Sequence, residues 1–208
     1  MVNAEKPVLL VDVDGVLIFP NDPDATHWTA NLKRDVGFER KALSDHFFRP
    51  FWKDIVTGKD TLMPRLEQAL QAMGSTVKAT DLRDYWFAND ARRNVPLIAW
   101  VDAQRDAGHR VMLATNQEHE RAAYIMDTIG LSAHCDGIYY SAALGMAKPN
   151  ALFFHEISKR EGRPLQDMIF IDDTKANVEA ARAEGLLAIH YTGQPPDQLT
   201  TAIVSGDA

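Results

Sequence analysis

Short apolar runs, each bounded by polar residues or glycine, recur along the chain. The first, Val8-Leu9-Leu10-Val11, follows Pro7 and is apolar at every position rather than at alternate positions. This pattern is typical of a central parallel strand, which is buried on both faces of its sheet. Further runs predict strands over Arg110–Thr115, Gly137–Ser141, Met168–Ile171 and Leu186–Tyr191.

Stretches that have the length of helices, each followed by a residue that commonly ends a helix, lie between these runs. The sequence predicts helices over Val95–Ala107, Glu118–Ile129 and Thr174–Glu184, because a glycine directly follows each of them and glycine commonly ends helices. Strands that alternate with such helices predict a parallel sheet with right-handed crossovers. The expected fold class is therefore α/β, with a doubly wound, Rossmann-like sheet. The last dozen residues are expected to form a polar tail.

A long segment separates the first two predicted strands, far more than the dozen or so residues that a simple crossover needs. Residues 20–92 fill this gap and are predicted to be almost wholly helical. The helices expected there cover Pro23–Val36, Glu39–Arg49 as far as Pro50, and Thr61–Met73, with a fourth that starts at Asp81 after an N-cap at Thr80. We therefore expect an α/β core of residues 1–19 and 93–208, with residues 20–92 as a helical cap over the sheet.

Composition excludes several classes of protein. The 208 residues suit one α/β domain with a smaller insertion, and 46% apolar and 25% charged residues are ordinary for a globular chain. A formal charge of -7 argues against nucleic-acid binding, which requires clustered Lys and Arg. Cys135 is the only cysteine, so it forms neither an internal disulfide nor a cysteine-based zinc site, and we expect a buried apolar residue.

Location follows from the apolar run near the N-terminus. The run Val8–Val13 is too short for a secretion signal or a membrane span, and Asp12 interrupts it. We therefore expect a cytoplasmic protein without a membrane partner.

Polar side chains gather where the predicted strands end. These residues are Asp12 and Asp14, Thr115 and Asn116, Lys148, and Asp172 and Asp173. Ligands bind at the carboxyl ends of strands in open α/β sheets. Neighbouring carboxylates would repel one another by about 4 kcal/mol per pair at about 4 Å and an effective dielectric of about 20. A divalent cation removes that repulsion, and Mg²⁺ is the natural choice because it prefers carboxylates, phosphate oxygens and water.

This set of side chains supplies the parts that phosphoryl transfer requires: a nucleophile, a metal site, a cation, hydrogen-bond donors and an acid. Carboxylates can act as nucleophiles by forming aspartyl-phosphates. Asp12 and Asp14 are two residues apart and so point to the same side of a continuing strand. If one attacks phosphorus, the other is placed to protonate the leaving oxygen and later to deprotonate water. Gly15 then lets the backbone turn sharply.

The same residues resemble, in order, the four motifs of the haloacid dehalogenase-like hydrolases. The matching segments are Val11-Asp12-Val13-Asp14-Gly15-Val16-Leu17, Met112-Leu113-Ala114-Thr115-Asn116, Lys148-Pro149, and Ile171-Asp172-Asp173 with Asn177. The resemblance covers nearly the whole chain. The predicted helical insertion, between the first and second motifs, is similar in position to that family's first type of cap.

The resemblance implies a role for each motif residue. Asp12 would be the nucleophile and a Mg²⁺ ligand, and Asp14 would be the general acid/base that also offers its backbone carbonyl to the metal. Thr115 and the backbone of Asn116 would bind phosphate, and Lys148 would steady both nucleophile and phosphate. Asp173 would bind the metal directly, with Asp172 and Asn177 supporting it.

The expected activity is hydrolysis of a small phosphorylated metabolite by a monomer or homodimer. A phosphomutase that passes the phosphoryl group to a sugar hydroxyl would use the same residues, and a non-catalytic binding protein on this scaffold is a third reading. Halide displacement is disfavoured, because the resemblance implies that dehalogenases lack a carboxylate where this chain has Asp14.

The environment of the remaining aromatic and basic residues is predicted from the residues that surround them in the sequence. Trp28, Trp52 and Lys53 are the candidates for substrate contacts in the cap, whereas Trp86 and Trp100 are expected to pack in apolar cores. Three arginines are predicted to lie on the solvated sides of amphipathic helices: Arg121, Arg160 and Arg182.

Overall fold

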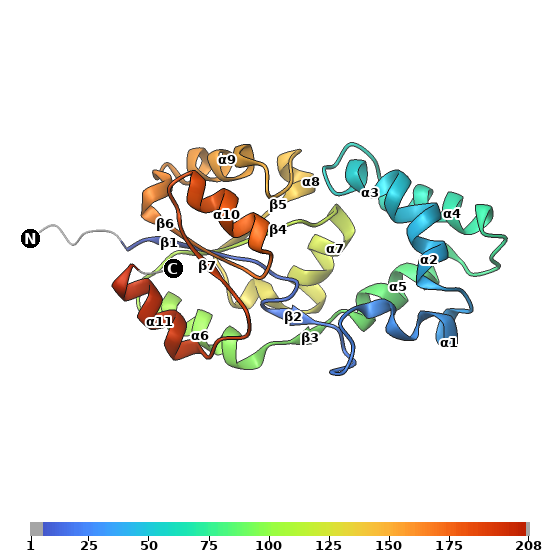
Figure 1. Ribbon diagram of the computed structural model, residues 1–208, viewed down its shortest axis with the longest axis horizontal. Helices are drawn as coiled ribbons and strands as arrows, with labels where there is room; N and C mark the ends of the chain where they lie inside the picture. Colours follow the sequence, from blue (N-terminus) through green and yellow to red (C-terminus); the bar gives the residue numbers. More distant parts are fainter. Residues whose placement is uncertain (1–5, 207–208) are drawn as a thin grey trace, which may run out of the picture.

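A five-stranded parallel sheet forms the centre of the chain (Figure 1). The computed structural model describes residues 6–206, so the ends of the predicted core, residues 1–5 and 207–208, lie outside the described residues. The strand order is β5-β4-β1-β6-β7, and every neighbouring pair is parallel. The strands are β1 (Val8–Val11), β4 (Val111–Thr115), β5 (Gly137–Tyr140), β6 (Met168–Asp172) and β7 (Leu187–His190). All five coincide with the predicted strands to within a residue at each end.

Helices cover both faces of the sheet, because successive residues of the central strand point to opposite sides. Leu9 and Val11 belong to one buried cluster, and Val8 and Leu10 belong to another. The first cluster contains residues of α6 (Val95–Asp106), η3 (Tyr124–Thr128), η4 (Leu131–Ala133) and α11 (Pro196–Ser205). The second contains residues of α8 (Ser141–Leu144), α9 (Ala151–Glu161), η5 (Leu165–Asp167) and α10 (Lys175–Ala183). The predicted doubly wound α/β fold is therefore confirmed.

A helical insertion lies beyond the carboxyl edge of the sheet, on the right in Figure 1. An antiparallel ribbon of β2 (Ile18–Phe19) and β3 (Arg92–Arg93) forms its base. Its helices are η1 (Trp28–Asn31), α1 (Leu32–Val36), α2 (Arg40–Leu43), η2 (Ser44–Phe48), α3 (Arg49–Ile55), α4 (Leu62–Ala72) and α5 (Ala79–Asn89). The insertion has its own buried apolar cluster, separate from the two on the sheet.

Three predictions inside the insertion were wrong. Helix begins at Trp28 rather than Pro23. Helix also continues through Pro50, because the preceding turn, η2, is a wide π turn and Pro50 then occupies the first turn of α3, where a missing N–H costs little. Thr80 is not the cap of α5, which begins at Ala79, and the Thr80 hydroxyl instead donates to Asp81.

The predicted polar tail was also wrong, and α9 was not foreseen. Residues 196–205 form α11, whose Leu199 is buried in the first sheet cluster. The Trp100 indole N–H donates to Thr200 Oγ1 at 2.9 Å, so α6 holds α11 in place. Trp100 and Cys135 are buried in the same cluster, as predicted.

Within residues 6–206, none of the helices combines the length and the apolar character that crossing a bilayer requires.

The packing of α11 predicts a measurable contribution to stability. Leu199→Ala should lower the free energy of unfolding by about 2–5 kcal/mol, because it leaves a cavity in a packed cluster. Val204→Ala, on the same helix but 82% exposed, should change it by less than about 0.5 kcal/mol. Urea unfolding measures both. Equal effects of the two variants would show that α11 does not pack against the core.

Candidate active site

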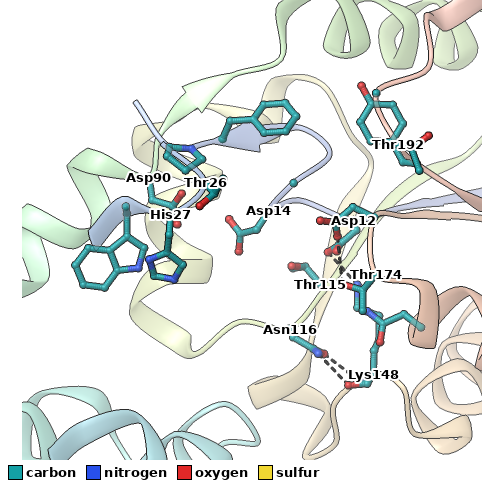
Figure 2. Close-up of a pocket in the computed structure, with 18 of the residues that line it drawn as sticks. Asp12, Asp14, Thr26, His27, Asp90, Thr115, Asn116, Lys148, Thr174 and Thr192 are labelled. Carbon is teal, nitrogen blue, oxygen red and sulfur yellow. Dashed lines mark hydrogen bonds and ion pairs between the residues drawn. The ribbon is translucent and has the colours of Figure 1, made fainter. Parts of the chain in front are cut away.

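The carboxyl ends of β1, β4 and β6 bring the predicted polar residues to one place (Figure 2). Val11 pairs with Ile171 on one side and with Leu113 on the other. Consequently Asp12 lies beside Asp172, the last residue of β6. The connection after β1 leads to helices on one face of the sheet and that after β6 to α10 on the other, so this is the crevice in which α/β proteins bind ligands.

Lys148 is the cation of the site, and it is almost completely buried. Its Nζ lies 2.9 Å from Asp12 Oδ1 and donates to Asp172 Oδ2 at 2.6 Å and to Ala114 O at 2.7 Å. An ammonium group has three N–H donors, so these contacts use all of them. Burial opposes the charge on Lys148, but Asp12 and Asp172 outweigh it and raise its pKa. The amine is therefore held as a cation.

Asp172 is fully buried, and its two oxygens are occupied by hydrogen bonds. Besides Lys148, it accepts from Thr174 N at 2.7 Å and from Asn177 Nδ2 at 3.1 Å to each oxygen. The neighbouring Asp173 is exposed and accepts from the Thr174 hydroxyl through Oδ1 at 3.3 Å. Asp173 thus keeps a carboxylate oxygen for a ligand, whereas Asp172 mainly positions Lys148.

Asp12, Asp172 and Asp173 form a group that fits a metal ion. One carboxylate oxygen from each lies within 4.8 Å of the others. Burial raises the pKa of Asp12 to about 7, with Lys148 opposing the rise and Asp172 adding to it. Three carboxylates against one amine leave two negative charges uncompensated, and a divalent cation would balance them. Such a hard cation suits an oxygen-only donor set.

Gly15 leaves the space that Asp173 occupies. Its φ of +78° is in the left-handed region that favours glycine. A Cβ at this position would lie 2.1 Å from Asp173 Oδ2. The turn after Asp14 therefore brings backbone close to Asp173 without a side chain in between.

Asp14 lies between Asp12 and the helical insertion, facing the cavity (Figure 2). Gln117 Nε2 donates to Asp14 Oδ2 at 2.5 Å and to Thr115 Oγ1 at 3.2 Å. The other oxygen, Oδ1, is the one buried side-chain polar atom without a hydrogen bond among residues 6–206. Oδ1 is buried and lies 3.7 Å from Arg121 Nη2, so Asp14 sits between an amide donor and a guanidinium while it lines the cavity.

Thr115 and Asn116 end β4 in different ways. Thr115 is buried and lines the cavity. The Asn116 side chain donates to Lys148 O at 3.0 Å and accepts from Lys148 N at 2.9 Å. Asn116 therefore fixes the loop that carries Lys148.

A cavity of about 910 Å³ opens between these residues and the insertion. Trp28 and Trp52 line it, but Lys53 is exposed and is not among the lining residues. Trp86 is buried in the insertion's apolar cluster as predicted, and it lines the cavity as well. The cavity thus has a charged end at the sheet and an aromatic end at the insertion.

A family model for haloacid dehalogenase-like hydrolases matches residues 7–185 of the chain. The chain belongs to this family. The match spans the strand ends that carry Asp12, Thr115 and Asp173 and also the loop between α8 and α9, where the structure places Lys148 rather than at a strand end.

Solved structures of other haloacid dehalogenase-like proteins share the fold. A family enzyme from Bacteroides thetaiotaomicron has a TM-score of 0.80 and 18% identity, covering 95% of this chain and 99% of that one. The structure of that enzyme with magnesium and inorganic phosphate has a TM-score of 0.78 and 20% identity, covering 94% and 99%. A predicted family hydrolase from Porphyromonas gingivalis has a TM-score of 0.75 and 21% identity, covering 97% and 98%. These likenesses show the fold.

Curated relatives match over shorter segments. The sesquiterpene phosphatase astK of Aspergillus oryzae is 38% identical over 68 residues, 33% of this chain and 33% of the relative. The GMP/IMP nucleotidase YrfG of Escherichia coli is 27% identical over 89 residues, 43% of this chain and 40% of the relative. The matched segments thus cover well under half of either relative.

Several residues at the site were not foreseen from the haloacid dehalogenase-like motifs: Gln117, Asp90, His27, Thr174 and His190. Gln117 directly follows Thr115 and Asn116, and that adjacency is a signal that could have identified it. The others come from the insertion, from the loop after β6 or, for His190, from the end of β7, and no pattern in the sequence distinguishes them.

Arg121 was predicted to be solvated, and this was wrong: only 1% of its side chain is exposed. It donates to the carbonyl oxygens of Phe87, at 3.1 Å, and of Asp90. The same guanidinium lies 3.7 Å from carboxylate oxygens of Asp14 and Asp90. Burial and the nearby Asp14 raise the pKa of Asp90 to about 6, and Arg121 opposes this rise. Arg121 therefore ties the end of α5 to α7 (His119–Ala123) beside Asp14.

Arg160 and Arg182 are exposed, as predicted.

This contrast between arginines predicts different stabilities. Arg121→Met should lower the free energy of unfolding by about 3–5 kcal/mol, because it strips a buried carboxylate and two carbonyls of their donor. Arg160→Met, at an exposed pair with Glu156, should cost about 1 kcal/mol at most. Chemical unfolding of both variants gives the comparison. A loss for Arg121→Met no larger than that for Arg160→Met would contradict the anchoring role.

Proposed function

We propose that this chain is a magnesium-dependent phosphatase that hydrolyses a small phosphomonoester through a phosphorylated Asp12. One observation carries the proposal: Lys148 holds Asp12 and Asp172 by ion pairs at 2.9 and 2.6 Å, at the sheet edge where Asp173 and Thr115 also lie. This arrangement supports the proposal, because a carboxylate, a cation and a hydroxyl group surround one point. Phosphoryl transfer depends on such positioning and charge stabilisation more than on other chemistry.

The first half of the reaction forms a bond between Asp12 and phosphorus. The Asp12 carboxylate attacks, the bond from phosphorus to the ester oxygen breaks, and the leaving alcohol takes a proton from Asp14. The positive charge of Lys148 and a hydrogen bond from the Thr115 hydroxyl stabilise the phosphoryl oxygens. In the second half, water attacks phosphorus and gives a proton to Asp14, while the bond between phosphorus and the Asp12 oxygen breaks. Free phosphate leaves, and Asp12 and Asp14 return to their starting states.

Mg²⁺ would be held by the carboxylates of Asp12 and Asp173 and by the backbone carbonyl of Asp14. Asp172 and Asn177 would support this set, since Asp172 already accepts hydrogen bonds at both oxygens. When bound, the metal supplies positive charge that neutralises the carboxylates and the phosphate oxygens.

Residues 20–92 are proposed to act as a cap that excludes water from the phosphate site. Support comes from the cavity, because residues of this segment, such as Thr26, Trp28 and Asp90, line it together with the catalytic strand ends. The names of the two curated relatives, a sesquiterpene phosphatase and a nucleotidase, describe removal of phosphate from organic molecules. Both are consistent with a small phosphorylated metabolite as substrate.

The covalent role of Asp12 is tested by replacing one oxygen. Asp12→Asn should lower kcat by at least about a thousandfold, because an amide is a poor nucleophile, while the far-ultraviolet circular dichroism stays unchanged. Asp127→Asn, at an exposed carboxylate, should keep normal activity. The measurement is free phosphate released from a panel of phosphate esters with Mg²⁺ and with EDTA. Retention of more than a few per cent of activity by Asp12→Asn, or full activity in EDTA, would refute the mechanism.

The metal site is tested through Gly15. Gly15→Ala and Gly37→Ala both place a side chain at positive φ, so each should cost about 1–2 kcal/mol of stability. Only at Gly15 does the added Cβ collide with Asp173, whereas none of the described atoms lies within 4 Å of a Cβ at Gly37. Calorimetry should therefore show Mg²⁺ affinity at least about tenfold weaker for Gly15→Ala alone. Equal Mg²⁺ affinity in the two variants would remove Asp173 from the proposed ligand set.

A further inference from the structure

Four aromatic rings of the insertion form one wall of the cavity, and we call Trp28, Phe48, Trp52 and Trp86 the aromatic wall. Trp86 contacts each of the other three. It stacks on Trp28 with 5.2 Å between ring centroids and an interplanar angle of 16°, and it lies 5.7 Å from Phe48 and 5.5 Å from Trp52. Phe48 and Trp52 are only half-buried, so part of their surface remains to be covered. The wall presents fixed, flat apolar surface to the cavity.

At this end of the cavity two carboxylates share one cation. Lys148 is the one Lys or Arg among the lining residues in the described part of the chain, and it is engaged at the phosphate end. The carboxylates of Asp14 and Asp90 both lie 3.7 Å from the Arg121 guanidinium. Burial lowers the pKa of His27, so its ring is neutral near pH 7. Among the described lining residues no further Lys or Arg is available to a second anionic group on the substrate, and Asp14 and Asp90 would repel such a group.

The cavity also has room for more than a phosphoryl group. Its volume of about 910 Å³ is in the upper part of the range for small-molecule sites, roughly 300–1,000 Å³. The catalytic residues occupy the end at the sheet, and the rest of the space lies against the aromatic wall. A bound ester would therefore place its alcohol portion there.

From these observations we infer that the preferred substrate is the monophosphate ester of an uncharged, apolar alcohol, whose hydrocarbon or aromatic part packs on the aromatic wall. This inference rests on the proposed phosphatase activity and adds the substrate class to it. Apolar contact area against Trp52 and Phe48 provides the selectivity, because burying it removes both surfaces from water. A second phosphate or a carboxylate on the substrate would be desolvated without a partner.

The substrate class is tested with esters that share one phosphate and differ in the alcohol. The probes are octyl phosphate and naphthyl phosphate for hydrocarbon and aromatic groups, glycerol phosphate for a hydrophilic group, fructose bisphosphate for a second anion, and choline phosphate for a cation. With Mg²⁺ present, kcat/KM for octyl or naphthyl phosphate should exceed that for each of the other three by at least about tenfold. The ratio between the octyl and naphthyl esters separates a hydrocarbon preference from an aromatic one.

The role of the wall is tested by Trp52→Ala, with Asp54→Ala on the exposed side of the same helix as control. Trp52→Ala should lower the ratio of kcat/KM for naphthyl phosphate to that for glycerol phosphate by about tenfold, mainly through KM. Asp54→Ala should leave the ratio unchanged. A merely structural role for Trp52 would lower both rates equally and would not move the ratio. If Trp52→Ala does not fold, Phe48→Ala provides the same comparison.

Each outcome of the panel decides the inference. Equal or faster turnover of glycerol phosphate, fructose bisphosphate or choline phosphate would overturn the substrate class, while the phosphatase activity would stand. Turnover of none of the esters would instead remove the proposed function and the inference with it. An unchanged selectivity ratio in a folded Trp52→Ala or Phe48→Ala variant would show that the aromatic wall is only a packed core.

Discussion

The buried ammonium group of Lys148 is the contact on which the site depends. It joins Asp12 after β1, Ala114 of β4 and Asp172 of β6, so one side chain links the carboxyl ends of three neighbouring strands. Removing one member of such a buried set leaves unpaired charge in a poorly solvating environment, which is costly. The carboxylates can therefore lie close together only because Lys148 lies between them, and the charge that remains uncompensated is what suits the site to a divalent cation.

The side chains proposed for catalysis and those proposed for substrate recognition stand on different parts of the fold. Asp12, Thr115 and Asp173, which are proposed to act in catalysis, end or follow strands that two packed clusters hold from both faces of the sheet. The aromatic wall stands on helices with their own cluster, connected to the sheet by the β2–β3 ribbon and by Arg121. Under the proposed function, a different set of side chains in the insertion would change which alcohol fits, without any change to Asp12, Asp14 or Lys148.

The errors made from the sequence share a physical origin. Arg121 lies in a helical stretch where a charged residue normally faces solvent, but the end of α5 packs over it and supplies carbonyl acceptors. A proline normally ends a helix. Pro50 does not, because a π turn precedes it and it lies in the first turn of α3, where its missing N–H costs little. Residues 196–205 mix polar and apolar positions near the chain end, and Leu199, Ala202 and Ile203 pack against the sheet cluster while Trp100 donates to Thr200, which docks them as α11. Each outcome depends on a partner distant in the chain.

The sequence by itself determined the five strands, their parallel arrangement and the doubly wound class, because a fully buried strand must be apolar at every position. It also indicated the motif residues, since Asp12, Thr115, Lys148 and Asp173 each follow or end a predicted element in family order. Only the tertiary structure decided which of the nearby side chains are paired, how Gln117 and Arg121 approach Asp14, and that four aromatic rings meet in one wall. Strand patterns depend on local periodicity and burial, whereas these contacts join segments whose relative placement no local pattern encodes.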